Sequence, residues 1–347
     1  MRLFSKWILT NAGQYENHVP PCSVRGVPKR QAAQAWLPAA LHIEASWKAT
    51  RKGCYQACSI DTAKFFDQIS FPLAGEALHD LRISNQVIKA WMGNTIHLRR
   101  YVSAKGAILR DPFKASKGIP QGDPLSMLIA ARVLGSWTIQ LPREVPHKHV
   151  FVDDRLLLDS SDSRLQHTLS LTCQWDAERN FVTKPKTVTF GKNPAPQNLH
   201  WPDGDTVTRS EQVTYLGIAM PCSKCQRESF FQPMVEKLTA LLRRAQRSHL
   251  TQQQAAAIVA LKVIPAITYP AMAIRPTDRQ VRTLGSAING AAHGRSMANF
   301  QAHALLIAKT HQFHVPAACI YSSLMGWYRA LRCIPDLPSF CADSFST

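Results

Sequence analysis

The sequence predicts an α+β domain with an antiparallel sheet, followed by an α-helical domain. Two strand-like runs flank an adjacent pair of aspartates within residues 147–159, which indicates a β-hairpin. Short strands and helical stretches alternate around this hairpin, and from about Glu228 the apolar residues recur at helical spacing. We therefore divide the 347 residues into an arm at 1–50, a sheet domain at 51–220 and a helical domain at 221–347.

The arm is expected to be mainly extended. Pro20, Pro21 and Pro28 stand there among few periodic apolar positions. The segment Gln31–Lys48 is rich in alanine and mostly helical in composition, and Pro38 marks a break or kink within it.

The sheet domain is expected to begin with a strand at Cys54–Ile60 that runs directly into Asp61. Two helical stretches should follow, at 73–81 and 85–99, and then a hairpin at 101–109.

A loop punctuated by two glycines and two prolines comes next, at Lys117–Ser126 (KGIPQGDPLS). It should open a helix, because Leu128, Ala131 and Leu134 recur at helical spacing after it.

The central hairpin places Asp153 and Asp154 at its tip, between strand-like runs at His149–Val152 and Leu156–Leu158. Aspartate is common in turns, so an ordinary hairpin is one interpretation. A turn usually recruits glycine or asparagine beside its aspartate, however, and here Arg155 follows directly. Two adjacent carboxylates repel each other, which is understandable if a divalent cation lies between them and a third carboxylate.

The remaining elements complete the predicted order of strands and helices. A helix is expected near 163–180, with short strands at 186–190 and 212–218. The helical domain should contain an apolar face formed by Val235, Leu238, Leu241, Leu242 and Ala245, and a second helix at 255–263.

The charge balance points to a polyanionic partner. The chain carries 41 Lys and Arg against 23 Asp and Glu, a net charge of +18. Nucleic acid is the favoured partner, and a solvated basic surface is the alternative. No run of about 18 apolar residues is present, so we expect neither a transmembrane helix nor a membrane partner.

The nine cysteines are typical of reduced, intracellular thiols, because their number is odd and they are scattered along the chain. Cys222 and Cys225 form a lone C-x-x-C pair without a second pair at zinc-finger spacing, which makes a zinc site the weaker interpretation.

A third carboxylate for the hairpin pair is available at Asp61, 92 residues before Asp153. A strand that delivers Asp61 at its end could lie beside the hairpin. Two divalent cations held there could activate a 3′-hydroxyl and stabilise a leaving pyrophosphate. Mg²⁺ prefers carboxylates plus substrate phosphates, so two or three aspartates suffice. The G-x-x-x-x-G-K-[ST] phosphate loop is absent from the sequence, which counts against an ATPase.

Several segments together resemble the successive motifs of reverse transcriptases, and the similarity is greatest to the non-LTR (LINE-type) retrotransposon branch. The segments, in order, are Asp61–Asp67, Gly118–Ser126, Phe151–Asp154, Asn180–Thr187 and Tyr215–Ile218. The later segment Val263–Tyr269 is similar to the helical region that follows the polymerase domain in this branch. The resemblance implies a right-hand polymerase palm, with helices on one face of its antiparallel sheet, and an α-helical thumb.

The resemblance also implies roles for individual residues. Asp61, Asp153 and Asp154 would bind Mg²⁺ (or Mn²⁺), and Lys186 would protonate or neutralise pyrophosphate. Phe66 would lie under the incoming sugar and exclude a 2′-hydroxyl, although a phenylalanine after a strand is otherwise a core residue.

Other residues would contact the nucleic acids. Gln121 and Gly122 would lie along the template and the nascent base pair, and Tyr215, Leu216 and Gly217 would position the primer end. The implied partners are an RNA template, a DNA primer and dNTPs, and the implied location is intracellular and nuclear.

The chain also departs from the family pattern. Most of the fingers motifs expected before Asp61 are not found, so we expect a piece of a longer polyprotein with a remnant of the fingers at 1–50. Two alternatives to an active polymerase of this branch stay open: a catalytically degenerate nucleic-acid-binding remnant, and an intron-maturase-type reverse transcriptase. An RNA-dependent RNA polymerase is disfavoured, because such enzymes usually precede the aspartate pair with glycine and Val152 stands here.

Overall fold

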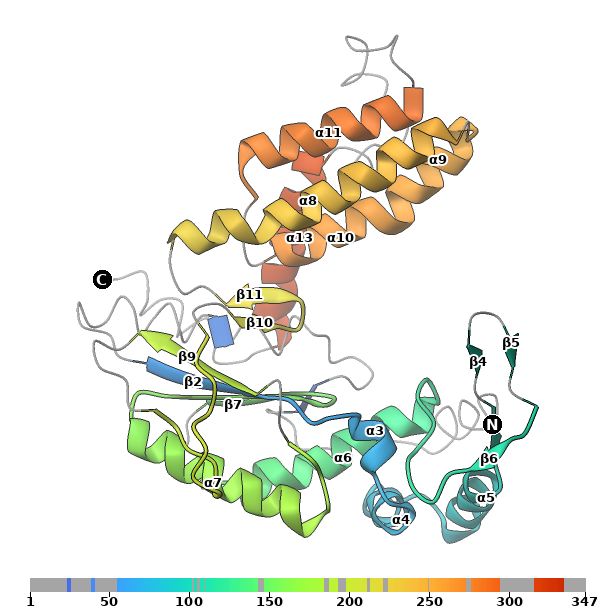
Figure 1. The fold of residues 1–347 in the computed structure, drawn as a ribbon, viewed down its shortest axis with the longest axis vertical. Coiled ribbons are helices and arrows are strands. Elements are labelled where there is room, and N and C mark those ends of the chain that lie inside the picture. Colours follow the sequence, from blue (N-terminus) through green and yellow to red (C-terminus); the bar gives the residue numbers. More distant parts are fainter. Residues whose placement is uncertain are drawn as a thin grey trace. The chain divides into compact units, whose positions relative to one another are not determined.

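The computed structural model describes residues 24–25, 39–40, 55–101, 103–104, 107–108, 110–142, 147–183, 187–192, 198–210, 213–220, 224–248, 250–272, 276–293 and 315–333. The chain forms two compact units, the first comprising residues 1–39 and 46–211 and the second residues 40–45 and 212–347. The predicted α+β domain followed by an α-helical domain is confirmed (Figure 1).

The first unit contains a sheet of five strands in the order β1-β7-β8-β2-β9. Their bounds are Val24–Arg25 for β1, His147–Phe151 for β7, Asp154–Asp159 for β8, Tyr55–Ile60 for β2 and Val188–Lys192 for β9. Four of the strands pair antiparallel, and β1 pairs parallel with β7. Two residues of the expected arm thus form the edge of the sheet.

The central hairpin consists of β7 and β8, and its register pairs Phe151 with Asp154. Strand β2 then pairs with the other side of β8, with Ile60 opposite Arg155. The hairpin strands are longer than the sequence indicated, but the aspartate pair lies at their junction as predicted.

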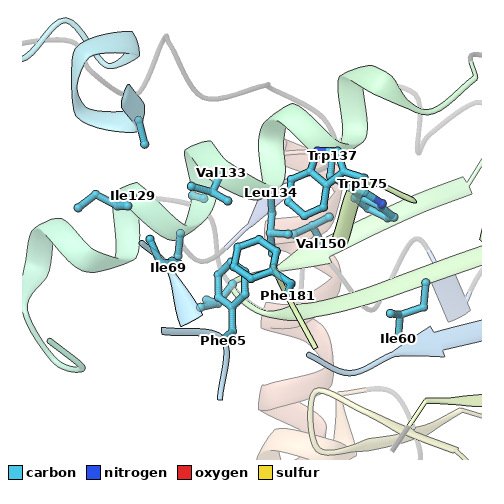
Figure 2. Close-up of a cluster of buried hydrophobic side chains, with 14 of the residues drawn as sticks. Ile60, Phe65, Ile69, Ile129, Val133, Leu134, Trp137, Val150, Trp175 and Phe181 are labelled. Atoms are coloured by element: carbon cyan, nitrogen blue, oxygen red, sulfur yellow. The ribbon is translucent and has the colours of Figure 1, made fainter. Parts of the chain in front are cut away.

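Two helices, α6 (Pro124–Gln140) and α7 (Asp162–Glu178), cover the same face of this sheet (Figure 1). Between them and the sheet lies the main core, where Trp137 of α6, Val150 of β7 and Trp175 of α7 are buried (Figure 2). Burial of large apolar side chains at about 25 cal/mol per Å² is the main force that holds the layers together.

Three shorter helices follow β2, namely α3 (Phe65–Gln68), α4 (Phe71–Asp80) and α5 (Asn85–Ile96). Helix α4 has the features of a well-defined N-terminus, since the Ser70 hydroxyl accepts a hydrogen bond from the Leu73 N–H and Pro72 lies in the first turn. The hairpin expected at 101–109 is present as β4 (Ser103–Ala104) and β5 (Ala107–Ile108). It is enclosed by the paired strands β3 (Arg99–Arg100) and β6 (Phe113–Lys114).

The main segment of the second unit, from residue 212 on, begins with a short hairpin, β10 (Val213–Tyr215) and β11 (Ile218–Met220), where one strand was expected at 212–218. Its helices are α8 (Lys224–Arg247), α9 (Gln252–Ile258), a π-helical turn (Val259–Val263), α10 (Ile264–Ala271), α11 (Asp278–His293) and α13 (Val315–Cys333). Helix α8 packs against α11, and α10 packs against α13.

The apolar face predicted for the helical domain is present on α8, where Val235, Leu238, Leu242 and Ala245 are buried and Leu241 is half-buried. The continuous helical stretch Gln253–Ala271 is long and apolar enough to cross a bilayer when judged by length and composition alone. Core helices of soluble proteins pass the same test. About a third of this stretch is buried within the protein.

Some expected features lie outside the described residues. These are most of the helix expected at 31–48, the side chains of Cys222 and Cys225, and Lys186.

Candidate active site

Three aspartates converge where β2 and the β7–β8 hairpin end. Asp61 directly follows β2, Asp153 lies in the two-residue turn of the hairpin, and Asp154 is the first residue of β8. Since Ile60 is paired with Arg155, the register brings Asp61 opposite Asp154. Directly opposed residues of antiparallel strands share a face, and successive residues alternate between faces. Asp61 and Asp154 therefore share the face opposite to that of Ile60 and Arg155.

The hairpin turn holds a strained residue. Val152 has a φ of 58°, in the left-handed region that a β-branched side chain rarely adopts. Such a conformation costs about 1–3 kcal/mol and persists only where the surrounding structure determines it. Here the paired strands on both sides of the turn impose it, and they place Asp153 beside Asp154 at the strand ends.

The carboxylates affect one another electrostatically. Burial raises the pKa of Asp154 to about 6, and the neighbouring charges of Asp153 and Asp61 add to this rise. Burial also raises the pKa of Asp153, and the Asp61 charge contributes in the same direction, against a backbone hydrogen bond that lowers it. Three carboxylates within mutual electrostatic reach would be stabilised in their charged form by a cation.

A divalent cation fits the chemistry of this donor set. Among the described residues, no three His, Cys, Asp or Glu side chains are arranged as a ready-made metal cage. Mg²⁺ does not need one, because it is usually held by one or two carboxylates and completed by water and substrate phosphates. The aspartates supply oxygen ligands of the required kind, so Asp61, Asp153 and Asp154 are the residues that would hold Mg²⁺ here.

The segment at 118–123 is fastened to the chain that follows Asp61. The N–H of Gly118 donates to the Ile69 carbonyl at 2.9 Å, and the N–H of Ile119 donates to the Phe66 carbonyl at 2.9 Å. Gly118 has a φ of +96°, and a Cβ there would lie 3.0 Å from backbone atoms of Asp67. A side chain at Gly118 would crowd the backbone of Asp67, so glycine is needed for the loop to come this close. The two backbone hydrogen bonds then hold residues 118–119 against residues 66–69.

Phe66, Gln121 and Gly122 all belong to this joined region. Phe66 is half-buried and packs against the edge of the core, whereas its neighbour Phe65 is fully buried. Gln121 is exposed. Gly122 has a φ of +81°, and a Cβ there would meet no atom of the protein within 4 Å. Gly122 is thus required by its backbone conformation and borders open space.

The segment predicted to carry Lys186 is bonded to the end of β2, although Lys186 itself lies outside the described residues. The N–H of Asp61 donates to the Thr187 hydroxyl at 3.2 Å. The N–H of Ala63 donates to the Val182 carbonyl at 3.0 Å, and Thr62 and Thr183 form an isolated β-bridge. Thr187 after Lys186, and Val182 and Thr183 before it, are therefore bonded to residues 61–63.

Tyr215, Leu216 and Gly217 lie in the β10–β11 hairpin of the second unit. Tyr215 is buried, and Leu216 and Gly217 form the turn with φ values of 53° and 75°. The Tyr269 hydroxyl on α10 donates to the Leu216 carbonyl at 2.9 Å. The turn is thereby attached to a helix of its own unit.

Sequence reasoning missed Gly118 as a contact residue and Tyr269 as a support of the hairpin turn. Both lie in segments that the resemblance had identified, at Gly118–Ser126 and Val263–Tyr269, but a pattern of residues does not show which backbone atoms approach them. The sequence feature that could have indicated a close contact at Gly118 was its position in a loop directly before Ile119 and Pro120.

Comparison with known proteins identifies the family. The family model described as reverse transcriptase (RNA-dependent DNA polymerase) matches residues 7–220. This is more than half of the chain, and it includes the three aspartates. The chain belongs to the reverse transcriptase family. This reverse transcriptase match ends at Met220, the last residue of the β10–β11 hairpin.

A curated relative supports the predicted branch. The chain is 24% identical over 236 residues to the retrovirus-related Pol polyprotein from type-1 retrotransposable element R2 of Popillia japonica. The aligned part is 62% of this chain and 38% of the relative, so the chain spans well under half of the curated protein that it matches. The resemblance to non-LTR reverse transcriptases is confirmed.

Solved structures with some likeness to this reverse transcriptase include two telomerases. The Candida tropicalis telomerase in complex with a TWJ fragment of telomeric RNA has a TM-score of 0.46 and 12% identity, covering 99% of this chain and 56% of that one. The corresponding Candida albicans complex has a TM-score of 0.41 and 12% identity, covering 100% of this chain and 54% of that one.

Proposed function

We propose that this chain is the polymerase part of a retrotransposon reverse transcriptase, which adds dNTPs to a primer 3′-hydroxyl on an RNA template. The observation that carries the proposal is the convergence of Asp61, Asp153 and Asp154 at adjoining strand ends, within a chain of the reverse transcriptase family. The net charge of +18 suits the nucleic-acid partners that the reaction requires. A nuclear location follows from this proposal, since the element's target would be chromosomal.

Each candidate residue has a distinct role in this proposal. Two bound Mg²⁺ (or Mn²⁺) ions would supply the activation of the 3′-hydroxyl and the stabilisation of the pyrophosphate. Asp61, Asp153 and Asp154 would hold these ions and so fix the position of the triphosphate. Lys186, in the segment tied to Asp61 through Thr187, would donate a proton to the departing pyrophosphate.

The substrate contacts would come from the joined region that holds Phe66, Gln121 and Gly122 and, separately, from the β10–β11 hairpin. Phe66 would close the space beside the sugar 2′ position, and Gln121 would contact the template. Gly122 borders open space, where the nascent base pair would lie. Tyr215, Leu216 and Gly217, held by Tyr269, would support the primer end.

The test is Mg²⁺-dependent extension of a DNA primer on an RNA template by wild type and Asp153→Asn. We expect the variant to lose roughly a thousandfold or more in rate, because metal ions contribute several kcal/mol of transition-state stabilisation and each 1.36 kcal/mol is tenfold. Primer–template binding should be nearly unchanged. The matched control is Asp80→Asn, which removes an exposed carboxylate paired with Arg132 and should extend like wild type.

A second candidate is a catalytically degenerate remnant that binds nucleic acid without extending it. The observation that it rests on is the net charge of +18, which suits nucleic-acid binding whether or not the aspartates hold metal ions. A wild-type chain that binds primer–template but shows no extension with Mg²⁺ or Mn²⁺ would establish this alternative. Wild-type-like extension by Asp153→Asn would instead contradict the two-metal mechanism.

A further inference from the structure

Arg155 is the residue directly after Asp154, and its side chain is completely buried in the core of the first unit. Its Nη1 and Nη2 atoms donate to the two carboxylate oxygens of Asp176 on α7, each at 2.9 Å. The guanidinium carbon lies 5.4 Å from the ring centre of Trp137 and 6.0 Å from that of Trp175. A charged side chain thus occupies the apolar layer between the sheet and the two helices.

The same guanidinium also contacts the segments beside the other site residues. Its Nη2 atom donates to the Thr62 hydroxyl at 2.8 Å, and Thr62 directly follows Asp61. It also lies 3.3 Å from the Thr183 hydroxyl, which itself donates to the Asp176 carboxylate. One planar group therefore joins β8, the end of β2, α7 and the segment that leads to Lys186.

The alternation of side chains explains why this group can act on the metal site without entering it. Arg155 and Thr62 lie on the helix-covered face, while Asp154 and Asp61 lie on the other face. Arg155 is bonded covalently to Asp154, and Thr62 to Asp61. A change in the distance between Arg155 and Thr62 would therefore also change the distance between the carboxylates of Asp154 and Asp61.

Stability alone does not account for this arrangement. A buried ion pair recovers little beyond its desolvation cost, and an apolar pair of similar volume is often as stable. The Nε atom of Arg155 has no hydrogen-bond partner among the described residues, which adds to that cost. What the guanidinium provides, and an apolar side chain would not, is a rigid fork that fixes direction as well as distance.

We propose that Arg155 is a positioning residue: with Asp176 and Thr62 it sets the spacing of Asp61 and Asp154 so that both can bind the same divalent cations. This rests on the proposed function only in taking these carboxylates as the metal site. Arg155 touches neither metal nor substrate in this proposal.

The test replaces the ion pair by an apolar pair, Arg155→Met with Asp176→Leu, so that no unpaired charge is left in the core. We expect its thermal midpoint to stay within a few degrees of wild type. Two quantities should change: the Mg²⁺ concentration for half-maximal primer extension should rise at least tenfold, and the affinity for Mn²⁺, followed by electron paramagnetic resonance without nucleic acid, should fall by a similar factor.

Two controls accompany this variant. Arg164→Met removes the ion pair between Arg164 on α7 and Asp159, which lies at the end of β8 opposite to Asp154. It should leave both metal readouts unchanged. Asp154→Asn should remove the Mn²⁺ signal that belongs to this site.

The outcomes separate the positioning proposal from the polymerase proposal. If wild type extends no primer, the polymerase proposal fails, and the Asp154-dependent Mn²⁺ affinity still decides the role of Arg155. Wild-type metal dependence in a folded apolar variant would overturn the positioning role. The absence of any Asp154-dependent Mn²⁺ binding would also overturn it. A lower rate of extension with an unchanged Mg²⁺ midpoint would do the same, because a merely structural role of Arg155 produces that result.

Discussion

At the scale of single residues, Phe65 and Phe66 show how two adjacent identical side chains can serve different purposes. The Phe65 ring is buried and lies 5.2 Å from that of Phe181, inside the core. The Phe66 ring is half-buried, at the edge of the core, and its carbonyl is held by Ile119. The interpretation of Phe66 as a plain core residue fits Phe65 better.

Phe66→Val is therefore expected to change sugar selection. In the proposed function, removing the ring opens space at the 2′ position of the sugar, so incorporation of ribonucleotides relative to deoxyribonucleotides should rise. A steric overlap of about 1.4 kcal/mol between the ring and the 2′-hydroxyl corresponds to about a tenfold change in this ratio. Primer extension with each nucleotide type measures the ratio.

Phe65→Leu is the matched control for this change. It should cost at most about 1.5 kcal/mol of stability, as apolar swaps of similar volume do, and leave the ratio of the two nucleotide types unchanged. An active Phe66→Val variant with the wild-type ratio would return Phe66 to the core.

At the scale of elements, the loop at 117–126 shows where a glycine is required by contact and where by conformation. Gly118 meets the backbone of Asp67, while Gly122 faces open space, and both have positive φ. A Cβ at either position is strained, but only at Gly118 would it also collide with a neighbouring segment. The two glycines can thus be distinguished by stability alone.

Gly118→Ala should destabilise the protein more than Gly122→Ala. Both lose roughly 1–3 kcal/mol to the unfavourable backbone conformation. Gly118→Ala should lose roughly a further 1–3 kcal/mol, because overpacking forces the two segments apart. Urea unfolding of the two variants measures the difference, and equal midpoints would contradict the close approach to Asp67.

Much of the element order could be predicted because local patterns determine it. The strand before Asp61, the hairpin around Asp153 and the apolar face of α8 follow from side-chain periodicity and turn chemistry, which act over a few residues. The pairing of Val24–Arg25 with β7 could not be predicted, because it joins segments more than 120 residues apart through backbone atoms that any residue supplies.

The candidate site was predictable to the same extent. Asp61, Asp153 and Asp154 were predicted as one site because they match the motifs of a known family, and the structure places all three where β2 and the β7–β8 hairpin end. Arg155 was noticed only as an unusual neighbour, since nothing in its surroundings indicates that Asp176, 21 residues later, will face it across the core. Partners of this kind depend on how a helix is placed on a sheet.

At the scale of the whole molecule, the net charge of +18 suits the binding of a polyanion such as nucleic acid. Part of that charge borders a groove of about 750 Å³ beside α8 and α11. The groove is lined by Arg243 and Arg279, by Glu236, by neutral polar side chains and by the apolar Val235 and Ala240. Other basic residues are already paired, as Arg132 is with Asp80 at 2.7 Å. Arg243 and Arg279 are suited to contacts with phosphates, whereas the charge of Arg132 is committed to Asp80.

Binding of primer–template is therefore expected to weaken steeply with salt. Each phosphate neutralised on a duplex adds about 0.9 to the slope of log K against log salt, and six to ten contacts cost roughly 10³–10⁵ in affinity between about 50 and 200 mM. Arg243→Gln should lower the slope by about 0.9, for the loss of one contact. Arg132→Gln is the control and should leave the slope unchanged, because its charge is committed to Asp80. Fluorescence anisotropy of a labelled primer–template over this range measures all three slopes. Affinity that is independent of salt would mean that the excess charge does not serve nucleic-acid binding.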